Sequence, residues 1–327
     1  MSGEGNTVES TTCKVLLKEG ALAREEHNYL EALRCYEAAL ALQPSYPMAT
    51  LDKGLTLVKL RRYEQALACF EACHNTPVEA QALVNEGSCL YLMNRKEEAL
   101  ACFDQCISKY PSESGAYYNK GLALLHLRRF DDANSAFVVC LKLDPKNADA
   151  TYRRGVALTE LSIYRLALVS FNFCLKLCPT RADALCDKGL VLNEIERYSE
   201  AIDCFGLLLS EHPAHVAAHF GKGLAHHELG HYEEALACFD HCDESDLYLW
   251  NSRGLSYNGL EQWEEAEKCF ERCLSIDPNF SVALYNLAFT QRKQNKLETA
   301  LETYDLCLKQ DPNDKSILAF KGNALYE

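Results

Sequence analysis

Residues 116–145 read AYYNKGLALLHLRRFDDANSAFVVCLKLDP, and they contain two helical patterns, one after the other. In each half, apolar side chains return every three or four positions, which places them on one face of a helix. Ala133, Phe137 and Cys140 carry the second pattern. Pro145 lacks the N–H that a continuing helix would need, so the second helix should end before it. The stretch therefore predicts a pair of short amphipathic helices.

This helix-pair pattern returns about every 34 residues along the chain, which is the mark of a repeat protein. Each unit has a small residue near its start, then an alanine, an aromatic residue and, in nearly every unit, a closing proline. The small residue is Gly20, Gly54, Gly87, Gly121, Gly155, Gly189, Gly223, Gly254 and Gly322, with Ala288 once in its place.

The repeated residue types all favour close packing between helices. Small residues let two helices approach closely, and the aromatic ring fills the space that is left. Each pair leaves an apolar face that only a neighbouring pair can bury, so stacking produces a one-dimensional array. The ring belongs to Tyr36, Phe70, Phe103, Phe137, Phe171, Phe205, Phe239, Phe270 and Tyr304.

The order of small residue, alanine, aromatic residue and proline resembles the tetratricopeptide repeat. The resemblance covers about residues 13–327, with nine near-complete units and one further helix. It implies an all-α fold, a right-handed superhelical α-solenoid of stacked antiparallel helix pairs. We expect residues 1–12 to form a disordered tail. The expected units begin at about residues 13, 47, 80, 114, 148, 182, 216, 247 and 281, with a final helix from residue 315.

The composition limits the expected partners and the compartment. The formal net charge is −14 and the isoelectric point is about 5.2, so the chain should repel nucleic acids. No apolar run reaches the roughly 18 residues that span a bilayer, so we expect no membrane insertion. The first residues lack the features of a secretory signal. With seventeen cysteines, the expected location is the reducing cytoplasm.

Cysteines recur in pairs four residues apart, as in Cys69 with Cys73 and Cys102 with Cys106. Four residues is also the helical period, and in the repeat family the second of these positions is a small packing site between helices. Cysteine behaves there as a small hydrophobic residue, and the chain has none of the CxxC pairs typical of zinc sites. We expect no metal site and no cofactor, and a thiol or metal sensor remains as an alternative.

Histidines are concentrated in one part of the chain. Seven of the ten lie between His212 and His241. His215 and His219 have the spacing of four residues that can chelate a metal on a helix. Because the resemblance places several of these histidines between paired helices, we interpret them as packing residues.

No sequence motif of catalysis is present in the chain. It has no P-loop, no GxSxG, no HExxH, and no GxGxxG after a strand. We therefore expect no enzyme activity and interpret the chain as a protein–protein interaction scaffold. The alternative is a targeting or adaptor region of a larger enzyme or multiprotein machine.

In the family that this chain resembles, the first helices of all units line a concave groove. We expect this groove to bind an extended or helical segment of a partner protein that carries apolar anchors and basic residues. Self-association remains open. The early groove is mostly apolar, with Leu17, Leu51, Leu55, Val58, Tyr91 and Leu92. The candidate site residues are Tyr118, Asn119, Leu122, Tyr152, Arg153, Asp183, Asp187, Asn193, Glu194, Phe220, His227, Glu228, Asn251 and Asn258.

One binding mode of the family, the chaperone-binding carboxylate clamp, can be checked residue by residue. The clamp needs Lys, Asn, Asn, Lys and Arg at five fixed groove positions. In the best register this chain keeps Asn119 and Arg153 but has Val84, Ser88 and Asp149 at the other three. Asp149 reverses a required charge, so the C-terminal tail of a chaperone should bind poorly.

Overall fold

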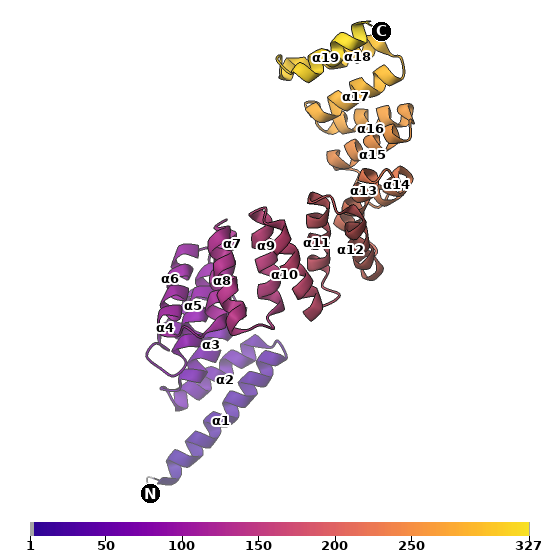
Figure 1. Cartoon of the computed structure of the whole chain (residues 1–327). Coiled ribbons are helices and arrows are strands. Elements are labelled where there is room, and N and C mark those ends of the chain that lie inside the picture. The colour runs from indigo at the N-terminus through magenta and orange to yellow at the C-terminus, as the bar shows by residue number, and fades with distance from the viewer. Residues whose placement is uncertain (1–2, 327) are drawn as a thin grey trace. The chain divides into compact units, whose positions relative to one another are not determined.

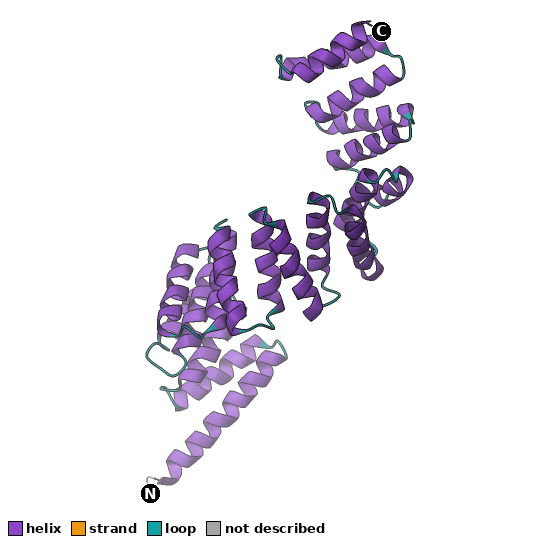
Figure 2. Cartoon of the chain, viewed as in Figure 1, coloured by secondary structure: helices purple, strands orange, loops and turns teal. Residues whose placement is uncertain are grey.

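The computed structural model describes residues 3–326, with side chains for residues 11–324. All regular secondary structure in this range is α-helical, and consecutive helices form pairs (Figure 2). The chain divides into two compact units, Met1–Ser170 and Phe171–Glu327. Within each unit the helices pack in sequence order, so the fold is an α-solenoid of helix pairs (Figure 1). No helix of the described range is both long and apolar enough to cross a bilayer.

The helices of the described range alternate between first and second members of a pair. The first helices are α1 (Gly3–Glu25), α3 (Pro47–Lys59), α5 (Glu79–Leu92), α7 (Ser114–His126), α9 (Ala148–Glu160), α11 (Ala182–Glu194), α13 (Val216–Glu228), α15 (Leu247–Gly259), α17 (Ser281–Lys293) and α19 (Lys315–Tyr326). The second helices are α2 (Tyr29–Leu42), α4 (Tyr63–Glu71), α6 (Lys96–Lys109), α8 (Phe130–Leu143), α10 (Tyr164–Leu177), α12 (Tyr198–Glu211), α14 (Tyr232–Phe239), α16 (Trp263–Ile276) and α18 (Leu297–Gln310).

The first helix differs from the expectation for the N-terminus. The sequence predicts a disordered tail over residues 1–12, but α1 is helical from Gly3, and residues 1 and 2 lie outside the described residues. Because α1 packs against α2, further residues extend an existing helix without a new nucleation cost. The other first helices begin at, or one residue from, the expected unit starts.

Helix pairs close on a contact between a glycine and an aromatic ring. A Cβ placed on Gly54 would lie 2.6 Å from Cε1 of Phe70, and one on Gly121 would lie 2.6 Å from Cε1 of Phe137. Both rings are fully buried. Carbon atoms do not approach this closely without a clash, so these two pairs reach their spacing because the first helix lacks a side chain at that point.

The turn between paired helices has a repeated backbone geometry. Between α7 and α8, Arg128 lies in the left-handed region with φ of 58°. The N–H of Arg128 donates to the carbonyl of Leu125 at 3.0 Å, and the N–H of Arg129 donates to the carbonyl of Leu124 at 2.9 Å. These two bonds cap the end of α7 in the Schellman pattern and reverse the chain. Gly230, which adopts a positive φ without strain, holds the same place between α13 and α14.

Ion pairs connect a second helix to the first helix of the next unit. Lys53 pairs with Glu37 at 3.1 Å, and Arg253 pairs with Asp240 at 2.8 Å. The carboxylates are more than half exposed, so each pair contributes at most about 1 kcal/mol of stability and acts mainly on register. The same two repeat positions pair as Lys120 with Asp104 and Lys321 with Asp305.

Candidate protein-binding groove

The start of α9 places two of the predicted groove residues of the first unit. Oδ1 of Asn147 accepts the N–H of Ala150 at 2.8 Å, which caps the helix and fixes its first turn. Tyr152 on that turn is buried, and the guanidinium carbon of Arg153 lies 5.3 Å from its ring centroid. The cap and the ring together hold the Arg153 cation in a defined place on the helix.

Three further predicted residues, Tyr118, Asn119 and Leu122, present half-buried side chains along α7. The ring of Tyr118 lies 6.1 Å from that of Phe137, the aromatic residue that closes its own helix pair. This contact makes the tyrosine part of a packed wall, with one face left towards solvent.

Leu122 and Arg153 line one pocket of about 270 Å³, together with Val156 and Glu160. Leu122 and Val156 supply apolar walls. At the edge, Nη2 of Arg128 lies 3.8 Å from Oε2 of Glu160. An apolar wall with a few charged groups at its edge is the usual composition of a site that holds a partner's side chain.

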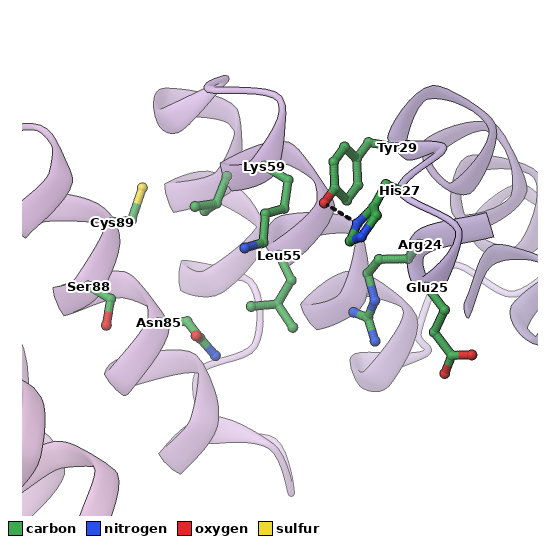
Figure 3. Close-up of a pocket in the computed structure, with 10 residues that line it drawn as sticks. Arg24, Glu25, His27, Tyr29, Leu55, Lys59, Asn85, Ser88 and Cys89 are labelled. Atoms are coloured by element: carbon green, nitrogen blue, oxygen red, sulfur yellow. Dashed lines mark hydrogen bonds between the residues drawn. The ribbon is translucent and has the colours of Figure 1, made fainter. Parts of the chain in front are cut away.

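A larger pocket of about 490 Å³ lies at α1, α3 and α5 (Figure 3). Leu55 and Val58, both expected for the early groove, line it. The other eight lining residues are absent from the candidate site, among them Arg24, His27, Tyr29 and Lys59. Periodicity could place Arg24 and Lys59 on first helices but did not show that they share a cavity. His27 lies in the turn after α1 and Tyr29 is the first residue of α2, both outside the mapped groove positions.

Predicted polar residues of the second unit connect successive first helices. Nδ2 of Asn193 on α11 donates to the carbonyl of Gly221 on α13 at 2.8 Å. Nδ2 of Asn258 on α15 donates to Oγ1 of Thr290 on α17 at 2.9 Å. These side chains therefore hold successive first helices together. The same joint between α15 and α17 has a second bond, in which Nδ2 of Asn286 donates to Oδ1 of Asn251 at 2.9 Å.

His227 makes the corresponding bridge from α13 to α15. Oγ of Ser256 donates its proton to the carbonyl of Ser252 at 3.0 Å, so Nδ1–H of His227 donates to Oγ of Ser256 at 3.0 Å. Burial lowers the pKa of His227, and the nearby Glu228 carboxylate opposes this less strongly. Burial also lowers the pKa of His226.

The predicted carboxylates of the second unit differ in their surroundings. Oδ1 of Asp183 lies 2.7 Å from Nε of Arg181, so this residue is engaged within the chain. Glu194 and Glu228 are exposed. Burial raises the pKa of Tyr198, and nearby carboxylates, that of Glu228 first among them, raise it further. Glu194 and Glu228 therefore give this part of the unit a negative potential.

Phe220 and Asp187 are the remaining predicted residues of the second unit. The ring of Phe220 lies 5.8 Å from that of the fully buried Phe239, which fixes its orientation. Asp187 is half-buried on α11. The first helices of this unit thus offer an aromatic surface beside carboxylates.

The histidines of the second unit have packing and capping contacts. Nδ1 of His215 accepts the N–H of Ala218 at 3.1 Å and so caps α13. The rings of His219 and His241 stack with centroids 4.4 Å apart, and Nε2 of His219 lies 2.8 Å from the carbonyl of Pro213. Among the described residues, no group of three or more His, Cys, Asp or Glu side chains is arranged to hold a metal ion.

Several thiols of second helices lie close to the backbone carbonyl of the first residue of their own unit. Sγ of Cys106 lies 3.6 Å from the carbonyl of Ala80, and Sγ of Cys273 lies 3.2 Å from that of Leu247. Burial raises the pKa of each of these thiols to about 11. At neutral pH they are protonated donors in the helix interface, and the nucleophilic thiolate form is rare.

Sequence comparison identifies the family. A family profile described as tetratricopeptide repeat matches residues 17–80, 51–114, 90–138, 118–171 and 186–241, which together span more than half of the chain. The chain belongs to the tetratricopeptide repeat family. Two further profiles of the same description match residues 248–280 and 269–302 of this TPR protein. A comparison with curated protein sequences gave no match.

Solved structures share the fold of this TPR chain. A structure from a study of PilF of Pseudomonas aeruginosa is 18% identical with a TM-score of 0.56, and the match covers 64% of this chain and 96% of that one. A chain of the APC/C hetero-tetramer Cut9–Hcn1 is 12% identical with a TM-score of 0.54, and the match covers 94% of this chain and 74% of that one. At these identities the likeness shows the fold alone.

The histidine bridge makes the stability of this TPR protein sensitive to pH. The pKa values of His226 and His227 in the folded protein lie below the ordinary value of 6.5. The unfolded chain therefore takes up protons first, and stability should be complete above about pH 7 and fall towards about pH 5. His227→Gln, which can still bond to Ser256, should lose less stability over this interval in urea titrations. If the free energy of unfolding changed with pH equally in wild type, His227→Gln and the exposed-site control His212→Gln, this assignment would be contradicted.

The thiols also give a direct expectation. Cys178 is the exposed cysteine among the seventeen, all of which are free. One thiol of the native protein should therefore react rapidly with a disulfide reagent such as Ellman's. Cys178→Ser should abolish this rapid reaction, because the other thiols are partly or fully buried. Several rapid equivalents in the Cys178→Ser protein would favour the thiol-sensor alternative instead.

Proposed function

We propose that this TPR chain is a non-catalytic scaffold that binds a segment of a partner protein along its first helices. The observation that carries this proposal is the pocket at α7 and α9, where Leu122 and Arg153 lie together with Val156. Packing and capping hold the walls of this pocket in place before any ligand arrives. A preformed site of this kind reduces the ordering cost of binding.

The segment that fits is one with spaced apolar anchors. Leu122 and Val156 can cover an aliphatic or aromatic side chain, and Arg153 can donate hydrogen bonds to a carbonyl beside it. The second unit, taken by itself, offers an apolar contact at Phe220, and its exposed Glu194 and Glu228 favour Lys or Arg in a segment bound there. The bound segment can be extended or helical, since both forms present side chains at regular spacing.

A reducing compartment such as the cytoplasm is part of this proposal. Thiols such as those of Cys106 and Cys273 lie inside helix interfaces in the protonated form. An adaptor role within a larger enzyme or assembly would use the same first-helix surface, with the partner segment as its docking element.

The test uses a library of random peptides displayed on phage, selected on the wild-type protein. Peptides recovered in this way should bind Leu122→Asp and Arg153→Glu about tenfold or more weakly, because each change removes a wall or reverses a charge of the pocket. Hydrogen exchange should show protection of α7 and α9 on binding. Lys142→Glu, a charge reversal on the exposed end of α8, is the matched control.

The outcome that contradicts the proposal is also clear. If selected peptides bind the two groove variants as well as wild type and protect the second helices instead, the binding surface is not the one assigned here. Circular dichroism of each variant separates a lost site from a lost fold.

A further inference from the structure

The second helix α10 has a row of exposed apolar side chains. Leu166, Val169 and Phe173 are 47%, 59% and 42% exposed. They are three and four residues apart on one continuous helix, so the helix alone places them along one face. Ile163, directly ahead of the helix, is 41% exposed and extends the row.

The helix pair does not need this row for its own packing. The buried face of α10 has Ala167, Phe171 and Cys174, and none of them is exposed to solvent. These are the alanine, the ring and the cysteine that recur in the second helices of the chain. The helix therefore buries its repeat residues and still leaves the apolar row in contact with water.

The other second helices have no such row. At the place of Leu166, five residues before the buried ring, they have Glu, Asp, Gln or Thr. At the place of Ile163 they have Arg, Lys, His, Gln or Asn, and at the place of Val169 a charged residue, serine or alanine. The row is thus a local departure from the repeat, and adjacent exposed apolar residues that the fold does not need mark an interaction surface.

Two cations lie along one edge of the row. Arg165 and Lys176 are exposed, and neither has an ion pair among the residues whose side chains the structure describes. They are eleven residues apart, close to three helical turns, so they lie above one another on α10. Arg165 is four residues before Val169, and Lys176 is three after Phe173. Each cation is therefore a neighbour of the row on the helix surface.

The spacing of the row suits a second helix. A helix whose apolar residues also return every three or four positions can place them between those of α10, as ridges into grooves. With 14 residues, α10 is roughly 21 Å long, which is enough for about two heptads of such a contact.

The charges do not suit a second copy of this chain. In a symmetric antiparallel pair of α10 helices, Arg165 of one copy would lie beside Lys176 of the other. Like charges would then meet at both ends, and α10 has no Asp or Glu to separate them. A helix with a carboxylate near each end of its apolar row would instead pair with both cations.

We infer that the exposed face of α10 binds an amphipathic helix of a partner protein. The apolar row of that helix packs on Leu166, Val169 and Phe173. Two of its carboxylates, about three turns apart, pair with Arg165 and Lys176. This surface belongs to a second helix, so it is additional to the first-helix pockets of the proposed function and does not rest on them.

The experiment uses the full chain and a synthetic helical peptide. The peptide is alanine-rich, with leucines three and four residues apart and two glutamates eleven residues apart beside them. It is labelled, and its binding is followed by fluorescence anisotropy at physiological salt, where a Debye length of about 8 Å screens the distant charges of the chain. A matched peptide has lysine in place of both glutamates.

The glutamate peptide should bind wild type and protect the amides of α10 in hydrogen exchange. The lysine peptide should bind about three- to tenfold more weakly. Leu166→Glu, which introduces the residue of several other units, should weaken binding of the glutamate peptide about tenfold or more. The double change Arg165→Glu/Lys176→Glu should reverse the preference between the two peptides.

Two controls separate this surface from other effects. Leu306 of α18 is also an exposed leucine on a second helix, at 46%, and Leu306→Glu should bind the glutamate peptide like wild type. Leu122→Asp, which alters the first-helix pocket, should also bind it like wild type. Failure of the phage-selected peptides on the first helices would therefore leave this result intact, and the reverse also holds.

Three results would overturn the inference. The first is no saturable binding of the glutamate peptide to wild type. The second is equal binding to Leu166→Glu, or equal binding of the two peptides to wild type. The third is self-association of wild type in sedimentation that Leu166→Glu abolishes, because the face would then be covered by a second copy of the chain.

Discussion

The close approach of a first-helix glycine to a second-helix aromatic ring is the constraint on which the rest of the structure depends. In the second unit, Phe205 meets two glycines. A Cβ on Gly189 would lie 2.6 Å from its Cε1, and a Cβ on Gly221 of the next helix pair would lie 2.5 Å from its Cζ. One ring thus sets both the spacing within a pair and the spacing to the following first helix. Repetition of this contact turns a local pair into a one-dimensional array.

The groove follows from this packing. When a ring and a glycine fill the centre of each pair, the other faces of the first helices are left to make lateral contacts or to meet a ligand. In the second unit, Asn193 and His227 use that face to connect neighbouring first helices. In the first unit, Leu122 and Leu55 line open pockets instead. A scaffold needs both kinds of residue, because binding to a preformed wall costs less ordering entropy than binding to a mobile one.

The fold could be predicted from the sequence because its signals are local and repeated. The period of the glycines and rings gives the helix pairs, and the proline positions give nearly all of the starts. The helical state of residues 3–12 could not be predicted, since helix extension depends on packing of α1 against α2. The site is harder to predict than the fold, because it too depends on contacts between helices. Repeat position predicts Asn258 for the groove face, but only the bond to Thr290 shows that its amide is engaged. His27 reaches its pocket from a turn, where the repeat pattern carries no information.

The most direct test of the central constraint is to add one methyl group at the same repeat position in two places. A Cβ on Gly121 would meet Phe137, whereas a Cβ on Gly322 of α19 has no atom within 4 Å. Gly121→Ala should lower the free energy of unfolding by roughly 1–3 kcal/mol, despite the better helix propensity of alanine. Gly322→Ala should leave it unchanged or raise it by up to about 1 kcal/mol. If urea denaturation showed that both substitutions stabilise the protein equally, the glycine–ring contact would not be what sets the spacing of the helices.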